Sequence, residues 1–504
     1  MNNKNQSKQK QILDVGQELH SAPKSLFAED DDNRDSQSIS DEYPLLKDVM
    51  TKYQALFVAC NLLLGIAPLI LPNSYLQAGA LFSTFFFLFL ALMSYISAEY
   101  VVESIGICNY IQFRKEQMSQ QYSNQLNNTL QQDGDKEGQK LEQKQLKQQL
   151  KREFRINRKF ELGEIALNFW GKEAQFLVSL IVIIFLIGVT IARCISIARI
   201  LKNTFSEVSV LNNFYFWLGC LILFTSLFSF KNVSSFAWVQ EYIAVIRLAA
   251  VSLIFFACFY QIYLEGFQGI QFKEYPLVNI TNLPSLSSTT TMFFCIHHSI
   301  PAFVKPITPQ KHVKWVLKGT HILGLSIILG ISFFGVQAFG EAIIDKYDVN
   351  FINYNFEQNE ILVYYTSALY IFLNAIAYPV FIITVRNNMM ELFAPSKIPK
   401  ISSQITPYTF SFTVGILLFL GTVSSLATNI QFVIDLIVGT LGVIIFLIIP
   451  TVSILEGRKK LKNEYGIDYK LNRYCSTISN QYLPYFLMVV GIIGFIYNSY
   501  NLAV

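Results

Sequence analysis

The feature that most constrains this chain is a series of apolar segments, each about as long as a membrane-spanning helix. A helix needs about 20 mainly apolar residues to cross the hydrocarbon core of a bilayer. Because backbone groups inside lipid must satisfy one another's hydrogen bonds, segments of this length cross as helices. The sequence therefore predicts an all-α polytopic membrane protein with about eleven transmembrane helices. The predicted spans lie near residues 53–72, 79–102, 174–200, 213–230, 236–263, 288–304, 315–340, 361–385, 407–427, 430–455 and 482–502.

The composition agrees with this class of protein and argues against several others. Hydrophobic residues make up 52% of the chain and charged residues 15%, whereas an ordinary soluble domain carries about 25% charged residues. The net charge of +4 is too small to indicate a nucleic-acid-binding protein. Seven cysteines without paired spacing indicate neither a disulfide framework nor a metal site. Because the sequence has no phosphate-binding loop and no soluble domain large enough for an active site, we expect neither an enzyme nor a bound cofactor.

The distribution of charge predicts the orientation of the chain. Residues 1–50 are polar and lack the apolar stretch of a signal peptide, so we predict a disordered cytosolic tail there and a transmembrane domain over 51–504. With the N-terminus in the cytosol, the loops on the opposite side hold only Lys202, Lys273 and Lys346 of the 39 lysines and arginines. This asymmetry follows the positive-inside rule.

Two segments outside the predicted spans allow more than one interpretation. The predicted cytosolic loop 104–172 contains a Gln- and Lys-rich stretch, 112–159, which has too few apolar residues to bury a core, although part of it can form a solvated helix. This loop is either a simple linker or a binding site for a regulatory partner. Asn279 begins an Asn-Ile-Thr glycosylation pattern in a predicted outer loop, and its occupancy stays open.

Two of the predicted spans contain residues that interrupt a helix. Gly65 and Pro68 lie in the middle of the first span, and His297, His298 and Pro301 lie in the sixth. Proline lacks the backbone donor that a helix interior needs. Five spans separate the start of the first span from the start of the sixth. Because five is an odd number, the second set of five spans would be inverted relative to the first. Interrupted helices at matching positions indicate a transporter site, although a single such proline would more simply indicate a kink.

Polar side chains within the spans are candidate functional groups, because they are costly in lipid. His297 and His298 are adjacent, and neighbours on a helix point about 100° apart, so at most one faces a central cavity squarely. A histidine titrates near physiological pH, which suits proton coupling; a packing role is the alternative. Asn61 lies four residues before Gly65, on the same helix face, where its amide would contact a substrate or cation, or bond to another helix. Asn374, in the eighth span, allows the same two interpretations.

Three further ionisable residues lie within spans. Arg193 is near the outer end of the third span, so we expect its side chain to reach the membrane surface. Arg247 is near the middle of the fifth span and needs a partner, either a carbonyl at a helix break, Glu241 or Asp435. His321, near the start of the seventh span, is predicted to lie at the interface.

Three motifs, taken in order, resemble those of the amino acid/auxin permease family. The first span contains a Gly-x-Gly-like break followed by prolines and a later glycine, the sixth contains histidine and is followed by proline, and the eighth contains Tyr-Pro followed by arginine. The resemblance covers about 50–504, with 112–159 as an additional insert. The residues that carry it are 65–69, Pro72, Gly79, His298, Pro309, 374–379 and Arg386.

The resemblance implies a LeuT-type fold, with a 5+5 inverted repeat and broken helices 1 and 6. It also implies secondary active transport of amino acids, coupled to H+ or Na+ by alternating access. His298 and Asn61 are then the candidate ion-coupling residues. Since no acidic residue is evident at either break, we expect a small neutral substrate. The candidate substrate-binding residues are Asn61, Gly65, Ile66, Ala67, Cys295, His298, Ser299 and Asn374.

Departures from the family pattern leave a second function open. Ala67 stands where the family usually has its second glycine, Pro68 replaces an aliphatic residue, and Lys305 lies near the position of a frequent glutamate. These changes fit a weakly transporting or non-transporting amino acid sensor that uses the same fold. A channel is disfavoured, because broken helices in inverted repeats suit alternating access. The resemblance and a dileucine-like pattern at 41–46 permit the plasma membrane or a vacuolar or lysosomal membrane.

Overall fold

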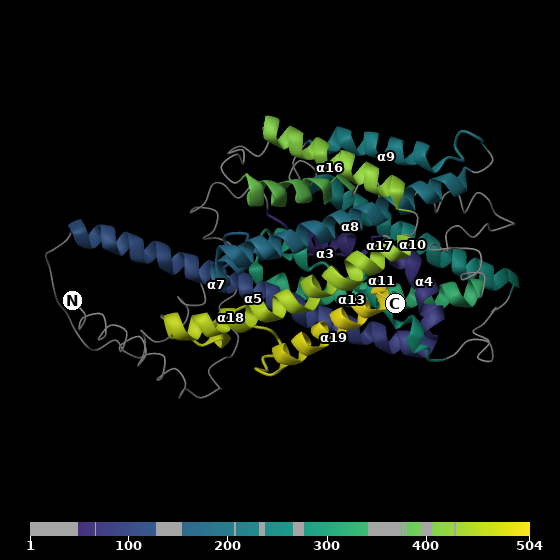
Figure 1. Ribbon diagram of the computed structural model, residues 1–504. Coiled ribbons are helices and arrows are strands. Elements are labelled where there is room, and N and C mark those ends of the chain that lie inside the picture. The colour runs from purple at the N-terminus through teal and green to yellow at the C-terminus, as the bar shows by residue number, and fades with distance from the viewer. Residues whose placement is uncertain are drawn as a thin grey trace.

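The described helices of the computed structural model run roughly along one common direction, as expected for a bundle that crosses a membrane (Figure 1). An isolated parallel bridge between Met50 and Ile307 ties the start of the bundle to the chain that follows its sixth predicted span. The residues described are 49–65, 67–127, 154–205, 208–230, 237–265, 277–340, 374, 378–379, 381–394, 406–427 and 430–503.

Seven helical segments within these ranges are long and apolar enough to span a membrane. A shorter apolar helix, α9 (Phe214–Ser229), matches the predicted fourth span. The chain is thus an all-helical polytopic membrane protein. The seven segments lie in α5 (Ala80–Asn127), α8 (Lys172–Thr204), α10 (Ala237–Glu265), α13 (Val313–Phe339), α16 (Pro407–Leu426), the run from α17 (Ile430–Leu436) to α18 (Ile449–Tyr465), and α19 (Leu483–Ala503).

The predicted first and sixth spans are each divided into two helical parts. The first consists of α3 (Lys52–Leu63) and α4 (Ala67–Ala78), and the sixth of α11 (Leu283–Phe294), a 3₁₀ turn, η5 (His297–Ser299), and α12 (Ile300–Val304). The predicted end of the first span at residue 72 was wrong, because α4 runs on to Ala78. The predicted start of the sixth span at residue 288 was also wrong, because α11 begins at Leu283. Two serines beyond the predicted limits bond between these helices, with Ser74 Oγ and Ser285 Oγ 3.2 Å apart.

The predicted eighth span, 361–385, lies mostly outside the described residues. Residues 381–393 are helical, and Asn374, Tyr378 and Pro379 are described on the same segment. The count of eleven helices therefore stays a prediction.

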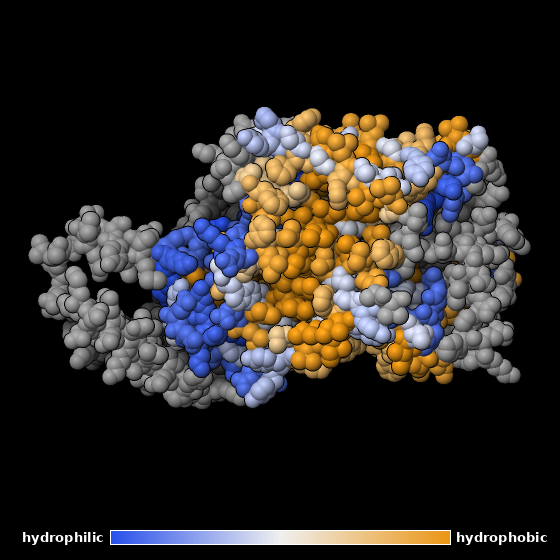
Figure 2. Space-filling view, in the orientation of Figure 1, coloured by the Kyte–Doolittle hydropathy of each residue, from blue (hydrophilic) through white to orange (hydrophobic). Residues whose placement is uncertain are grey.

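The surface carries an apolar band of the kind that lipid covers. Figure 2 shows hydrophobic residues across the middle of one face, with hydrophilic residues at either end. Side chains on several helices contribute, such as Leu223 on α9, Leu418 on α16 and Ile493 on α19, which are more than half exposed. Large exposed apolar areas are unusual on soluble proteins, so this band agrees with a position in the bilayer.

The helix of the predicted second span continues well beyond the predicted end at residue 102. It reaches Asn127, so the predicted cytosolic loop 104–172 begins as a helix. Polar pairs one turn apart support the extension, including Gln112 Nε2 to Glu116 Oε1 at 3.0 Å. Further along the chain, α7 (Leu162–Trp170) packs against α8, and Gly171 joins the two at a φ of 96°, a conformation that favours glycine.

The tenth predicted span is irregular at its centre. Between α17 and α18 it forms two π-helical segments, η9 (Ile437–Gly442) and η10 (Ile444–Ile448). Such segments widen a helix locally and often lie near functional sites. Here η9 packs against both α8 and α11, so it forms part of the support for the sixth-span break.

Candidate functional site

The two interrupted spans place their breaks beside one cavity. At the first, the amide of Leu64 still bonds to the Cys60 carbonyl, but the amide of Gly65 turns to the Leu63 carbonyl at 2.7 Å. At the second, the amide of Ile296 turns in the same way to the Phe294 carbonyl at 2.9 Å. Both helices therefore end in a tight turn within the protein.

Proline starts the helix that follows each break. Pro68 lies in the first turn of α4, and Pro301 occupies the first turn of α12. A first-turn amide has no partner within its own helix, so proline causes no loss there and its fixed φ suits the helix start. The prolines thus begin new helices rather than kink continuous ones.

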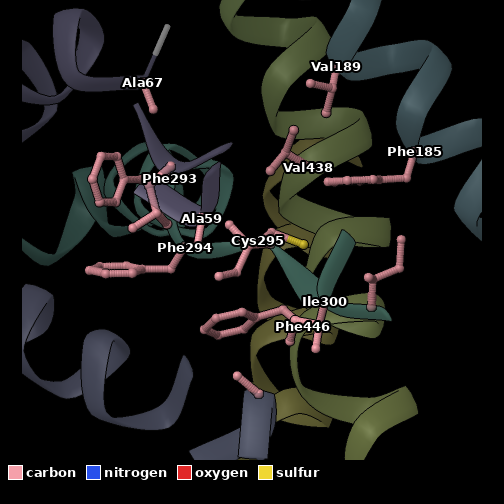
Figure 3. Close-up of a cluster of buried hydrophobic side chains, with 14 of the residues drawn as sticks. Ala59, Ala67, Phe185, Val189, Phe293, Phe294, Cys295, Ile300, Val438 and Phe446 are labelled. Carbon is pink, nitrogen blue, oxygen red and sulfur yellow. The ribbon is translucent and has the colours of Figure 1, made fainter. Parts of the chain in front are cut away.

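The cavity between the breaks has mainly apolar walls and two basic side chains. Figure 3 shows Cys295 within the buried hydrophobic cluster, with Phe294 on one side of it and Phe185 and Val438 on the other. Residues from the first break, the sixth-span break, α8 and the eighth segment contribute to the lining. These residues are Leu62, Leu63, Gly65, Ala67, Phe185, Val189, Arg193, Met292, Cys295, Ile296, His298 and Phe381.

Arg193 turns into this cavity, which corrects the prediction that it reaches the membrane surface. Its side chain is buried, and the residue is only 5% exposed. The guanidinium carbon lies 4.2 Å from the centre of the Phe381 ring, in cation–π geometry. A Cβ added to Gly65 would lie 2.6 Å from a terminal nitrogen of Arg193, so the guanidinium rests directly against the backbone of the first break.

The two adjacent histidines have different surroundings. His298 lines the cavity, and its ring centre lies 5.7 Å from that of Phe185. His297 is fully buried outside the lining, with its Nε2 at 2.7 Å from Ser97 Oγ and its ring edge-to-face with Phe446. This division agrees with the expectation that at most one of them faces the cavity.

Arg247 caps the end of the helix before the first break. Its guanidinium, on α10, donates a hydrogen bond to the backbone carbonyl of Asn61, near the C-terminus of α3. The last carbonyls of a helix lack partners and carry partial negative charge. A carbonyl at the break was one of the three partners that the sequence left open. Of the other two, Asp435 accepts a hydrogen bond from Ser288, and the side chain of Glu241 lies outside the description.

The predicted substrate-binding residues are only partly brought together. Gly65, Ala67, Cys295 and His298 line the cavity. Asn61, Ser299 and Asn374 do not line it, although Asn374 is buried. Ile66 lies outside the described residues.

A buried polar network on α5 was missed in the sequence. Ser94 Oγ lies 2.8 Å from His321 Nε2 and donates to the Phe294 carbonyl at the sixth-span break. His321 is 4% exposed, and its Nδ1 pairs with the Leu317 carbonyl. The prediction that His321 is interfacial was therefore wrong, because α5 covers it with a hydroxyl partner.

Two carboxylates continue this network toward the loop between α18 and α19. Glu99 accepts hydrogen bonds from Tyr95, Ser476 and Thr477. Glu103 accepts two from Arg458, at 2.8 and 2.7 Å. Glu99 lies within the predicted span 79–102, and a charged residue within a span is a candidate functional group. Its charge was therefore the sequence signal by which this network could have been found.

The cavity offers a fixed cation, an imidazole and apolar walls, with no carboxylate among its lining residues. Across the described parts of the chain, no group of three or more His, Cys, Asp or Glu is placed to hold a metal ion.

Comparisons with known proteins give a family match over most of the chain. Residues 48–500 match the family model described as "Transmembrane amino acid transporter protein". A protein of Dictyostelium discoideum named "Transmembrane protein 104 homolog" is 22% identical over 503 residues, which cover 90% of this chain and 97% of that protein. Its namesake in Drosophila melanogaster is 27% identical, over 66% of this chain and 74% of that protein. A solved manganese transporter of Eremococcus coleocola has a TM-score of 0.39 and 13% identity, covering 90% of this chain and 95% of that one.

Proposed function

This chain belongs to the family of transmembrane amino acid transporter proteins, and on that premise we propose that it carries amino acids across a membrane by secondary active transport. The proposed mechanism is alternating access, in which one central site opens to the two sides of the membrane in turn. The driving force is an ion gradient.

The observation that carries this proposal is the cavity shared by two interrupted helices. Gly65 and Ala67 reach it from the first break, and Cys295 and His298 reach it from the sixth-span break. Irregular backbone at membrane depth is tolerated where it lines a cavity. In inverted-repeat transporters, one repeat or bundle rocks against the other around such a site and so exposes it to either side.

The proposed architecture is the eleven-helix LeuT-type arrangement with two inverted sets of five. Breaks in the predicted first and sixth spans support it, since these positions correspond in the two sets. In this proposal the seven candidate spans, α9, the two interrupted spans and the eighth segment each cross the membrane once.

We propose a proton as the coupling ion, with His298 as its acceptor. His298 lines the cavity, and an imidazole can take up and release a proton near neutral pH. Asn61, the other proposed coupling residue, does not line the cavity, and its carbonyl accepts a hydrogen bond from Arg247. Sodium is the alternative that the experiment below includes.

The proposed orientation places the N-terminus in the cytosol. It assigns the long extension of α5 and the basic end of α18 to the cytosolic side and Asn279 to the opposite side. Asn279 lies at the start of a short 3₁₀ turn, where its side chain accepts a hydrogen bond from the Thr281 amide. Deglycosylation that changes the gel mobility of the wild-type protein, but not that of Asn279→Gln, would support this orientation.

Uptake by purified protein in proteoliposomes tests the proposed function. A mixture of labelled amino acids is supplied under an inward proton gradient or an inward sodium gradient, each imposed alone. Accumulation above equilibrium would support transport, and the effective gradient would identify the ion. We expect His298→Ala to abolish gradient-driven uptake, while His312→Ala, outside the cavity lining, keeps it.

Failure to accumulate any amino acid would overturn the transport proposal. If the same preparation then bound an amino acid saturably, the sensor alternative would take its place. If it neither carried nor bound one, the amino acid class itself would be wrong for this chain.

A further inference from the structure

The hydrogen bonds of His321 on α13 place a strict demand on the protons of its ring. Its Nδ1 lies 2.8 Å from the Leu317 carbonyl oxygen, and its Nε2 lies 2.8 Å from Ser94 Oγ. A carbonyl oxygen only accepts hydrogen bonds, so Nδ1 must carry a proton. A neutral imidazole has one such proton, so Nε2 would then be an acceptor and would need the hydroxyl hydrogen of Ser94.

The Ser94 hydroxyl already has another acceptor. Its Oγ donates to the Phe294 carbonyl at 3.2 Å, and a hydroxyl has a single hydrogen to donate. That hydrogen cannot serve the Phe294 carbonyl and His321 Nε2 at once. All three contacts are satisfied together when Nε2 also carries a proton and donates it to Ser94 Oγ. This arrangement therefore corresponds to a positively charged imidazolium.

Burial opposes a positive charge on this ring, and a nearby carboxylate favours it. His321 is 4% exposed, and removal from water disfavours a charged imidazole. The ring packs between two aromatic side chains, 5.8 Å from Tyr95 and 6.2 Å from Phe294 between ring centres. The Tyr95 hydroxyl donates to Glu99, which is buried one turn further along α5. The negative charge of Glu99 favours the protonated form of the imidazole.

Among the described residues, Glu99 and His297 are the titratable groups whose charge acts on the His321 ring. Helix α13 packs against α3, α4, α5, α10 and η6 (Gln310–His312). The other charged groups buried on these helices have partners of their own, since Glu103 binds Arg458 and Arg247 binds the Asn61 carbonyl. The remaining titratable groups on these elements include the buried Cys60 on α3, Tyr75 on α4, Tyr100, Cys108 and Tyr110 on α5 and Cys258 on α10, with Lys311 and His312 on η6.

His297 shows a different proton requirement. Its Nε2 lies 2.7 Å from Ser97 Oγ, and Ser97 donates to the Ser94 carbonyl at 3.1 Å. Nε2 must therefore donate to Ser97, and a neutral ring has the one proton that this contact needs. A neutral His297 does not repel a positive charge on His321. The two buried histidines thus differ in the protons that their contacts require.

The Phe294 carbonyl connects His321 and Ser94 to the cavity. It ends α11 and also accepts a hydrogen bond from the Ile296 amide at 2.9 Å. The last carbonyls of a helix have no partner within that helix, so the hydroxyl and the amide together hold this turn. Cys295 and Ile296, the next two residues, line the cavity. Loss of the Ser94 bond would therefore loosen part of the cavity wall.

We propose that His321 and Ser94 form a proton-binding site that controls the end of α11 at the sixth-span break. Proton uptake forms an N–H bond at Nε2, makes the ring positive and directs the Ser94 hydrogen to the Phe294 carbonyl. Proton release reverses these changes, so that Ser94 donates to Nε2 and leaves the carbonyl. The inference rests on the proposed function, because it adds a second proton-binding group, besides His298, to the same transport site.

Nitrogen NMR of the purified protein in liposomes tests the protonation state directly. The chain has five histidines, so labelling their ring nitrogens gives few signals, and loss of a signal in His321→Gln identifies the one from His321. We expect both nitrogens of His321 to carry protons at about pH 5 and only Nδ1 at about pH 8. His312→Gln should leave this signal in place, and His297 should stay neutral with its proton on Nε2.

Amide hydrogen exchange at residues 294–297 tests the effect on the break. Variants are compared with wild type at the same pH, so that the intrinsic exchange chemistry cancels. At about pH 5 we expect exchange in Ser94→Ala to be about three- to tenfold faster than in wild type, as the loss of one hydrogen bond allows. At about pH 8 the two should be similar, because Ser94 no longer binds the carbonyl. Ser326→Ala, whose hydroxyl bonds within α13, is the matched control and should equal wild type at both pH values.

The outcomes separate this inference from the proposed function, since neither measurement requires transport. A His321 ring that keeps one protonation state across this pH range would overturn the inference and leave transport with His298 standing. A Ser94→Ala effect that is absent, or equal at both pH values, would also overturn it. Absence of amino acid uptake would overturn the transport proposal, while a titrating His321 with a pH-dependent break would still support the proton site. If His321→Gln fails to fold, the exchange of wild type and Ser94→Ala still decides the question.

Discussion

Arg247 and Asn61 are joined by a hydrogen bond from a buried guanidinium to a backbone carbonyl, at the point where the first spanning helix ends. The residues belong to α10 and α3, and Arg247 is 1% exposed. The bond compensates the negative end of α3 inside the protein. It connects the position of the first break to a neighbouring helix.

Removing this cap should destabilise the protein. Arg247→Met leaves the Asn61 carbonyl without that donor, and an unsatisfied buried group costs about 1–3 kcal/mol. We expect a lower midpoint of thermal unfolding in detergent, with Arg247→Lys intermediate. Lys318→Met, at an exposed position on α13, is the control. An unchanged midpoint in Arg247→Met would refute the capping role.

Gly65 should be required for function through its contact with Arg193. An added methyl would lie 2.6 Å from the guanidinium and displace it from the cavity wall. We expect Gly65→Ala to reduce uptake by about tenfold or more, since a small misplacement at a site is costly. Gly219→Ala is the matched control, because nothing lies within 4 Å of its added Cβ. Equal uptake by the two variants would contradict this prediction.

The ion pair between Glu103 and Arg458 should contribute strongly to stability. Glu103 is fully buried, and the pair has a separation of 2.7 Å. Removing one partner leaves a buried charge, at a cost of about 3–5 kcal/mol. We expect Glu103→Gln to lower the unfolding midpoint markedly. The exposed pair Lys459–Glu456, at 3.6 Å, provides the comparison, and Glu456→Gln should change stability by about 0–1 kcal/mol. Similar shifts of the unfolding midpoint in both variants would argue against a strong stabilising contribution from the buried pair.

Glu391 should make stability depend on pH. Burial, and then the nearby Glu164 and Glu161, raise the pKa of Glu391 from 4.5 to about 7, although Lys159 and Arg158 oppose the shift. A raised carboxyl pKa means that the folded state binds the proton more tightly. The stability that protonated Glu391 contributes to the folded state is therefore fully present below about pH 4.5 and is lost as pH rises through about 7.

Thermal unfolding at pH 5 and pH 8 measures this dependence. We expect Glu391→Gln to stabilise the protein relative to wild type at pH 8 and to have little effect at pH 5. The same change at Glu464, whose side chain is 54% exposed, serves as the control. A Glu391→Gln effect of equal size at both pH values would count against the raised pKa.

The positions of the spans and of the two breaks were largely predictable from the sequence. Windows of about 20 apolar residues mark a membrane helix without any knowledge of its neighbours. Gly65, Pro68 and Pro301 interrupt a helix through their own backbone chemistry, which is a local property. The boundaries were less accurate, because Ser74 and Ser285 lie beyond the predicted limits, whereas the structure places both in helices and pairs their hydroxyls.

The chemistry of the cavity was decided only by tertiary structure. The sequence placed Arg193 near one end of a span, and a long side chain there can extend to the membrane surface or turn inward. Two features turn the Arg193 side chain inward. Helix α8 packs closely against η9, where an added Cβ at Gly188 would meet Ile437, and Gly65 leaves open space for the guanidinium. Likewise, the hydrogen-bond partners of Glu99 and His321 lie in segments far away in the chain. Hydropathy and backbone propensity are local and are therefore present in the sequence, whereas the partner of a buried charge depends on which helices meet.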